Sequence, residues 1–496
     1  MLSRWALFLA AVCLVCLGLA PALPATVERV LPSGMRVVAQ AAVDGDAFAV
    51  DLAVRSDGSE EGDLPGLRGV VARTLLAGAE GRDPEAAGAF TSLLEDEGGA
   101  TGGRANDELV EVNGYGPARH LVPFLELLRD ALVHPTFPEE TLQNDLKATR
   151  VFLQMSSPDQ EMERELRSVL FPVPAAAGSL GTDESLARIT RDDVVAFAKR
   201  LFAPERLVLA LVGPLPAEEL AAKVADLFGG LEASGAGAPQ LPDWHEQIRR
   251  EETREWPPLL DWKELGVPAG EAGPPALPSR GIVHEVDGAP VSRLMVGFEI
   301  PPVSSPDWPL GDMVAALLDP VSGGRLSQEA ALAQRSDNPF PATGAACSAA
   351  RAIAYNHLVI LAFGRAPGGP RFRALDWVRA LAVQGLAVHE DVMHAIESLR
   401  VSPPDAAELE RAKRRALGDS RIRLQTARDR AQFLALTSLA GLGTDGQQRF
   451  EERVRTTTPE DIQSFVATYL ASDEARVVYY LPRSDRPDGY TNFPML

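Results

Sequence analysis

The sequence is short of two kinds of residue that support common functions, cysteine and basic side chains. It has 3 cysteines among 496 residues, and two of them, Cys13 and Cys16, lie in an apolar segment at the N-terminus. Without that segment only Cys347 remains, and a single thiol cannot form an internal disulfide. The 69 acidic residues exceed the 48 basic ones, which gives a formal net charge of −21. Such a field repels phosphate backbones, so we expect no nucleic-acid partner.

Histidine is also scarce, with 7 in the chain, and the sequence contains neither H-x-x-E-H nor H-E-x-x-H. Both patterns place two imidazoles four residues apart, so that they reach one metal from one helix face. His389 and His394 flank Glu390 but are five residues apart, which turns them about 140° from each other on a helix. We therefore expect no metal there, and we interpret Cys347 as a small buried apolar residue.

A long charged-residue-free segment occurs only at the start of the chain. Arg4 precedes the apolar run Trp5 to Ala20, and small-residue cleavage sites follow it. This pattern predicts a signal peptide over residues 1–25. The run is short for a membrane span. We expect an exported, periplasmic protein without a stable membrane span after cleavage, with an uncleaved N-terminal anchor as the alternative.

The remaining length and composition indicate a globular chain of two or more domains. Hydrophobic residues make up 46% and charged residues 24%, which is close to the average of soluble proteins. Residues 48–54 alternate large apolar side chains with Ala49, Asp51 and Ala53, which predicts a strand with one apolar face. Residues 121–133 have the spacing of an amphipathic helix. Strands and helices occur in clusters, which is typical of the α+β class.

Two segments suggest an internal repeat. Thr190 to Phe197 precedes an apolar strand at 207–212, and Thr458 to Phe465 precedes another at 477–481. Each begins with a Thr placed to cap a helix, followed by acidic residues in the first turn and an aromatic residue. The repeat predicts two related halves, residues 26–232 and 281–483. A linker rich in Gly, Ala and Pro, residues 233–280, would join them, and residues 484–496 would form an irregular tail.

Several segments resemble the insulinase and mitochondrial-processing-peptidase family. Gly66-Leu67, Leu75 and Gly78 match the frame that carries this family's inverted zinc motif, H-x-x-E-H. Further matching segments of the first half, in order, are Leu31–Val37, Gly98-Gly99, Leu132–Phe137, Gly181–Leu186, Pro204–Leu207 and Val212-Gly213. Those of the second half are Gly297-Phe298, Pro301, Pro306-Asp307 and Gly324–Leu326. The resemblance implies two homologous α+β halves, each an antiparallel sheet with helices packed on it, forming a clamshell.

The positions of the zinc motif hold other residues. Aligned on the frame, the first zinc His becomes Gly69, the general-base Glu becomes Ala72, and the second zinc His becomes Arg73. The third ligand of the family, a downstream Glu, falls near Arg150, and no carboxylate occurs from residue 147 to 158. Gly and Ala can neither ligate a metal nor accept a proton, and an Arg would repel the metal.

The second half of active relatives contributes an Arg and a Tyr that bind and polarise the substrate. Aligned on Arg325-Leu326, those positions become Ala331 and Asn338, and no Tyr lies between Arg325 and Arg351. The resemblance therefore implies that both halves of the composite site have decayed. We expect no catalytic residue, no metal ligand and no cofactor.

The leading interpretation is a non-catalytic family member of the cell envelope. It would bind an extended peptide as an added strand, or pair with an active relative in a hetero-oligomer. One alternative is a zinc-dependent metalloendopeptidase with an unrecognised ligand set, which would bind zinc. Another is a periplasmic binding or assembly module. If Arg73 occupies the former metal space, its charge should be paired or reach solvent. The triple change Gly69→His, Ala72→Glu and Arg73→His should not by itself recreate peptidase activity.

Overall fold

A computed structural model describes most of the chain. It covers residues 25–42, 45–79, 84–155, 157–171, 179–235, 281–286, 293–326, 342–353, 356–364, 389, 391–472 and 474–482. The predicted signal peptide up to residue 24, the predicted linker from residue 236 and the tail lie outside the described residues. Ala331 and Asn338 also lie outside them. Among the described helices, none combines the length and the apolar character that crossing a membrane requires.

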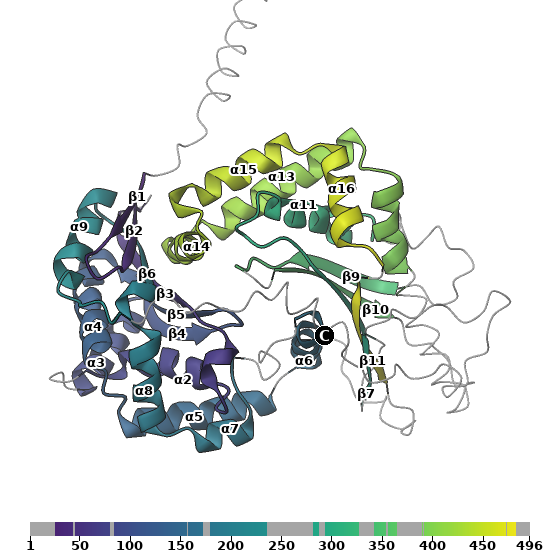
Figure 1. Ribbon diagram of the computed structural model, residues 1–496. Coiled ribbons are helices and arrows are strands. Elements are labelled where there is room, and N and C mark those ends of the chain that lie inside the picture. Colours follow the sequence, from purple (N-terminus) through teal and green to yellow (C-terminus); the bar gives the residue numbers. More distant parts are fainter. Residues whose placement is uncertain are drawn as a thin grey trace, which may run out of the picture.

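The first half is a six-stranded sheet with helices (Figure 1). Its strands are β1 (Thr26–Val30), β2 (Arg36–Ala41), β3 (Ala47–Arg55), β4 (Ala100–Ala105), β5 (Leu109–Pro117) and β6 (Leu207–Gly213). Its helices are α2 (Leu67–Thr74), α3 (Pro84–Asp96), α4 (Leu121–Val133), α5 (Glu139–Gln154), α6 (Pro158–Leu170), α7 (Asp183–Arg188), α8 (Arg191–Leu201) and α9 (Ala217–Phe228). The strand order is β1-β2-β6-β3-β5-β4, and every pair is antiparallel except β2 with β6.

The second half repeats this plan with five strands. They are β7 (Gly281–Val286), β8 (Arg293–Glu299), β9 (Ala342–Ala349), β10 (His357–Gly364) and β11 (Arg476–Pro482). Its helices include α11 (Trp308–Leu318), α13 (Ala406–Arg423), α14 (Ala427–Leu439), α15 (Gly446–Thr456) and α16 (Pro459–Tyr469). The order β7-β11-β8-β10-β9 matches β2-β6-β3-β5-β4, and again the first pair alone is parallel.

The predicted repeat is confirmed by these two sheets. Helices α8 and α16 both begin at a capping box, in which Thr190 bonds with Asp193 and Thr458 bonds with Asp461. Each helix leads into the strand that lies second in its matching sheet order, β6 or β11. The two segments that suggested a repeat are therefore equivalent elements of two homologous α+β halves.

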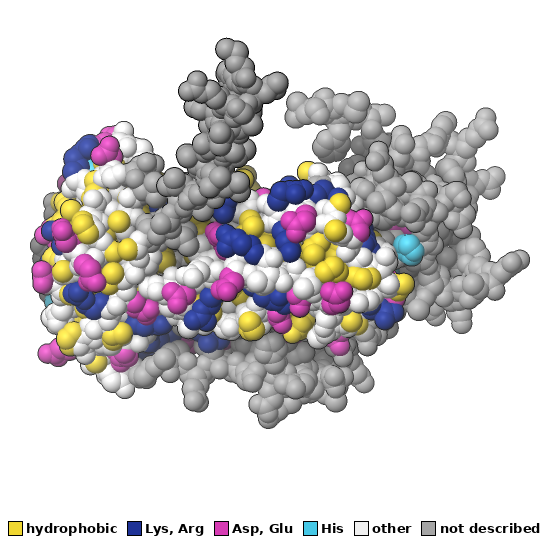
Figure 2. Space-filling view, turned by 90° about the horizontal axis from the view of Figure 1, so that it is seen from above, with side chains coloured by type: hydrophobic (Ala, Val, Ile, Leu, Met, Phe, Trp, Pro, Cys, Tyr) yellow, Lys and Arg dark blue, Asp and Glu magenta, His cyan; other side chains and the backbone are white. Residues whose placement is uncertain are grey.

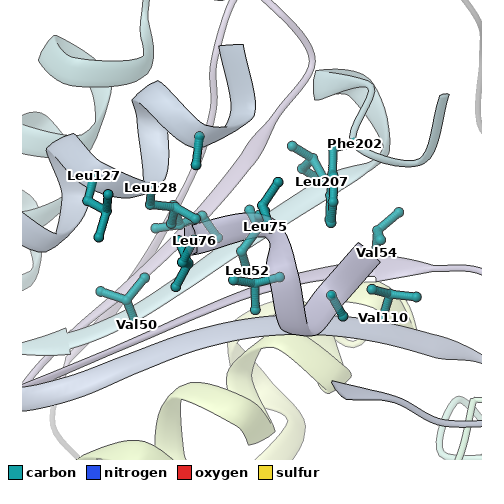
Figure 3. Close-up of a cluster of buried hydrophobic side chains, with 14 of the residues drawn as sticks. Val50, Leu52, Val54, Leu75, Leu76, Val110, Leu127, Leu128, Phe202 and Leu207 are labelled. Atoms are coloured by element: carbon teal, nitrogen blue, oxygen red, sulfur yellow. The ribbon is translucent and has the colours of Figure 1, made fainter. Parts of the chain in front are cut away.

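One face of the first sheet packs against the helices of its own half. Figure 3 shows Val50, Leu52 and Val54 of β3 directed toward Leu75 and Leu128 in one buried cluster. The alternation over residues 48–54 thus predicted the strand and its apolar face. Burying this face removes apolar area from water, which is the main stabilising contribution to the half.

The opposite face of each sheet is covered by a helix from the other half. Helix α14 lies on β3 and β6, and helix α6 lies on β8 and β11 (Figure 1). The first contact is formed by Val38, Ala49, Ala53, Val208, Ala210, Val212, Ala431, Leu434 and Ala435. The second is formed by Met162, Leu166, Leu170, Phe171, Met295, Val478 and Tyr480. Because the helices are exchanged, separating the halves would expose both sheets.

Candidate functional site

The candidate site lies around helix α2, between the two glycines that the family frame shares. Gly66 has a positive φ of 96°, and a Cβ there would lie 2.8 Å from the carbonyl oxygen of Leu180. At Gly78, a Cβ would lie 2.6 Å from Thr136 Oγ1. Both positions therefore need glycine, the first for its backbone conformation and both for close packing. The frame serves the local fold and persists without the metal ligands.

Gly69 has no room for a side chain in this arrangement. A Cβ at Gly69 would lie 2.6 Å from the carbonyl oxygen of Ser179 and 2.8 Å from Arg73 Nη1. The guanidinium of Arg73, one helical turn later, thus lies directly against Gly69. The two residues fit each other, and an imidazole at position 69 would displace the Arg73 side chain.

Arg73 is held by helix α5. Its Nε donates to Asp145 Oδ1 at 2.7 Å, and its Nη2 donates to Asp145 Oδ2 at 2.9 Å and to Thr149 Oγ1 at 3.0 Å. The side chains of Arg73 and Asp145 are 25% and 16% exposed. A planar guanidinium and a carboxylate form two parallel hydrogen bonds in this geometry. The prediction that the Arg73 charge is paired is confirmed.

The residue of α5 that faces the site is Thr149, one position before Arg150. Arg150 instead pairs with Asp183, with Nε 2.6 Å from Oδ1, and its hydrogen bonds lower the pKa of that carboxyl. Thr149 is adjacent to Arg150, near which the resemblance placed the third ligand of the family. Asp145 was missed altogether, although residues 145 and 149 are four apart and so share one helix face.

Ala72 brings the backbone of α2 against the edge of the sheet. Its carbonyl oxygen lies 1.9 Å from the place that a Cβ on Gly103 of β4 would occupy. Among the described strands, β4 pairs with β5 alone and ends the sheet. The site is thus a closed polar network of three residues, Arg73, Asp145 and Thr149, beside a sheet edge.

A zinc ion does not fit these residues. Gly69 and Ala72 have no ligand atoms, and Arg73 and Thr149 offer a fixed positive charge and a hydroxyl where zinc favours imidazole, thiolate or carboxylate. Asp145 is already engaged by the Arg73 guanidinium. Elsewhere in the described part of the chain, no group of three or more potential metal ligands occurs.

The other residues considered from the sequence do not form a site. His389 is buried, with its ring 6.3 Å from that of Tyr479, and burial lowers the pKa of its imidazole to about 4. His394 is exposed, and Glu390 lies outside the described residues. Cys347 lies in β9, and burial raises the pKa of its thiol. A protonated thiol is a poor nucleophile.

Comparisons with known proteins agree on one family. Residues 188–334 match the model described as "Peptidase M16 inactive domain". A curated relative, the uncharacterized zinc protease YmxG of Bacillus subtilis, is 26% identical over 155 residues, which are 29% of this chain and 36% of that protein. The chain thus matches about a third of that relative's length.

Two solved structures match nearly the whole chain. A protease from Helicobacter pylori has a TM-score of 0.73 at 15% identity, covering 93% of this chain and 100% of the other. The peptidase M16 inactive domain from Pseudomonas fluorescens has a TM-score of 0.69 at 20% identity, with the same coverage. At these identities the likeness concerns the fold.

The fold is that of an α+β clamshell protein of two homologous halves, and an Arg73–Asp145 charged pair joins helices α2 and α5 of the first half. The chain is a homologue of the insulinase and mitochondrial-processing-peptidase metallopeptidases, the M16 peptidases, and it lacks their zinc motif.

Proposed function

We propose that this protein is a non-catalytic homologue that binds extended polypeptide along strand β4. The observation that carries the proposal is the closed network of Arg73, Asp145 and Thr149 beside a sheet edge that has one neighbour among the described strands. The network supplies no group for peptide hydrolysis, whereas the edge supplies backbone groups that pair with no strand in the described part of the chain.

The chemistry of peptide hydrolysis needs a polarised carbonyl and an activated water. A guanidinium stays protonated at any physiological pH and cannot act as a general base. Both carboxylate oxygens of Asp145 accept hydrogen bonds from Arg73, so this carboxylate is not positioned to activate a water. Ala72 offers nothing at the position of the general base. We therefore expect no peptidase activity and no bound cofactor.

The edge of β4 can accept a further strand. The Asn106 backbone N–H donates to the carbonyl of Leu109 at 2.9 Å, which fixes the alternation of the antiparallel ladder. Gly102 and Arg104 therefore bond to β5, while Thr101, Gly103 and Ala105 direct their N–H and C=O groups away from it. An extended peptide can pair with these outward groups by strand addition.

The test is the affinity for an unstructured, fluorescein-labelled peptide of about ten residues, the reach of a strand-addition ligand. Thr101→Pro removes one outward N–H and leaves the bonds to β5, which edge strands tolerate. We expect binding about three- to tenfold weaker, the effect of one hydrogen bond. Thr101→Val, with a similar shape and the N–H retained, is the control and should bind as the wild type does.

Mass spectrometry of the same mixtures separates the alternatives. Intact peptide together with a selective loss in Thr101→Pro supports the proposal. Cleaved peptide would favour the zinc-dependent metalloendopeptidase. No binding by the wild type would favour a binding or assembly module of another kind. Against that last reading, the described part of the face in Figure 2 has acidic, basic and apolar side chains interspersed, without a continuous stripe of one kind.

We further propose that the protein is exported to the periplasm and pairs there with an active M16 relative. The apolar N-terminal run supports export, and the match to an inactive M16 domain supports pairing. Cell fractionation tests the first part. The pairing proposal predicts that the protein forms a stable complex with a relative from the same cell that contains H-x-x-E-H. Size-exclusion chromatography tests it, and purified components that elute separately would contradict it.

A further inference from the structure

A buried carboxyl group lies in the contact between the two halves. Asp51 is on β3, between Ala49 and Ala53, on the face that α14 covers, and it is 0% exposed. Neither of its carboxylate oxygens has a partner in good hydrogen-bonding geometry among the described residues, although the carboxyl of Glu111 is near enough to share its proton. An ionised carboxylate in such a place loses its hydration without compensation, so the site favours the neutral acid.

The groups around Asp51 come from each element packed against it. Strand β5 contributes Asn113, directly opposite, and Glu111; strand β4 contributes Arg104; helix α14 contributes Arg428. On β6 the residue opposite is Ala210, which carries no charge. Each arginine has another partner close by. Arg104 donates to Glu111 at 2.5 Å, and the guanidinium of Arg428 lies 5.1 Å from the ring centre of Tyr115.

Burial, and after it the charge of Glu111, raise the pKa of the Asp51 carboxyl well above its ordinary 3.8. The folded state therefore keeps a proton that the unfolded state has lost. The contact is most stable at low pH, and it loses stability as pH rises above 3.8 toward the raised value. Above that value a negative charge lies beside Glu111 under α14.

We propose that Asp51 is a proton-controlled latch between the halves. In its neutral form it lets the alanines of α14 pack closely on the first sheet, and on ionisation it loosens α14 from that sheet. The contact of α6 with the second sheet stays in place, so the halves remain joined while their relative position becomes adjustable. This inference is independent of peptide binding at β4.

Hydrogen exchange of the full chain between pH 5 and pH 8, corrected for the intrinsic rates, tests the latch. In the wild type we expect the protection of α14 amides to fall by about tenfold or more over this range, because opening of this contact releases one proton from Asp51. Helix α9, on the other side of the first sheet, should change little. Asp51→Asn keeps the shape of the side chain without its ionisation, and it should abolish the change in α14.

Glu452→Gln, an exposed residue of α15, removes the same charge elsewhere and should behave as the wild type does. Glu111→Gln provides a second test if Asp51→Asn fails to fold. It removes the neighbouring negative charge and frees Arg104, so the pKa of Asp51 in the folded state should fall. The pH-dependent loss of α14 protection should therefore stop at a lower pH and be smaller in total than in the wild type. Protection of α14 that is independent of pH in the wild type, or an unchanged pH response in Asp51→Asn, would overturn the proposal.

Discussion

Helix α14 on the first sheet and helix α6 on the second occupy equivalent places, but their contacts differ in side-chain size. Under α14, five alanines make up most of the contact, together with three valines, Leu434 and the buried acid Asp51. The α6 contact is made by large side chains, among them Met162, Leu166, Leu170, Met295 and Tyr480. Stabilisation follows the apolar area that is buried. The α6 contact should therefore hold the halves together, while the α14 contact is the adjustable one.

The largest expected effect comes from the large-residue contact. Leu166 is fully buried, and its methyl groups would lie 2.9–3.0 Å from a Cβ on Gly297 of β8. Leu166→Ala should lower the free energy of unfolding by about 3–4 kcal/mol, since it removes transfer energy and leaves a cavity. Leu434→Ala on α14 should cost about 2 kcal/mol. Urea unfolding measures both.

The control for these changes is Ile422→Ala, because Ile422 is 62% exposed and its loss should cost less than about 0.5 kcal/mol. A larger cost for Leu434→Ala than for Leu166→Ala would reverse the proposed order of the two contacts.

The close packing of a glycine between helix and sheet also differs between the halves. In the first half a Cβ on Gly103 would meet the backbone carbonyl of Ala72, which cannot move aside. In the second half a Cβ on Gly311 of α11 would meet the flexible end of Ile300 at 2.7 Å. Gly103→Ala should therefore destabilise by about 1–3 kcal/mol through overpacking. Gly311→Ala should be close to neutral, because alanine favours the helix by up to about 1 kcal/mol.

Thermal unfolding of Gly103→Ala and Gly311→Ala compares the two contacts. Gly102→Ala is the matched control in the same strand, since its Cβ would meet only Asn113 Oδ1 at 3.9 Å. Equal losses in Gly102→Ala and Gly103→Ala would mean that the strand, and not the packing against α2, determines the cost.

The charged pairs of the two halves are expected to contribute similar amounts to the free energy of unfolding. Arg73 pairs with Asp145 on α5, and Arg325 pairs with Glu408 on α13, at 2.7 Å and 2.9 Å. Asp145→Ala should cost about 1–2 kcal/mol, below the figure for fully buried pairs because both side chains are partly exposed. The double variant Arg73→Met, Asp145→Leu should recover most of that loss. Denaturant unfolding of the wild type, Asp145→Ala and the double variant checks this. A double variant less stable than Asp145→Ala would contradict it.

The smallest effect concerns Cys347, a reporter in the second half. Burial raises the pKa of its thiol, so at pH 8 the native protein should react with a thiol reagent far more slowly than the unfolded chain. Leu166 belongs to the first half, but the change Leu166→Ala should speed the reaction of Cys347 with the reagent, because α6 covers the second sheet. An unchanged rate in that variant would indicate that the halves open independently.

The local features of the fold could be predicted from the sequence. The alternation over residues 48–54 identified β3, and the Thr-initiated segments identified α8 and α16 together with the repeat. These signals arise within a few residues of chain. Burial of the opposite face of β3 could not be predicted, because the helix that covers Ala49, Asp51 and Ala53 is α14, more than 370 residues later in the sequence.

The site shows the same division between local and long-range information. The glycine frame identified Gly69, Ala72 and Arg73 correctly as neighbours on one short helix. The third-ligand position could be placed only near Arg150, because counting along the chain cannot fix the rotation of a distant helix. Asp145 was missed for a related reason, since only the packing of α2 on α5 shows which carboxylate pairs with Arg73.

The central claim, that a charged pair has replaced the metal, is tested most directly by elemental analysis. The purified mature protein is loaded with zinc and desalted, and zinc is measured per chain. We expect a value close to zero, because Gly69, Ala72, Arg73 and Thr149 supply no suitable ligands. About one tightly held zinc per chain, the stoichiometry of a single catalytic site, would contradict it.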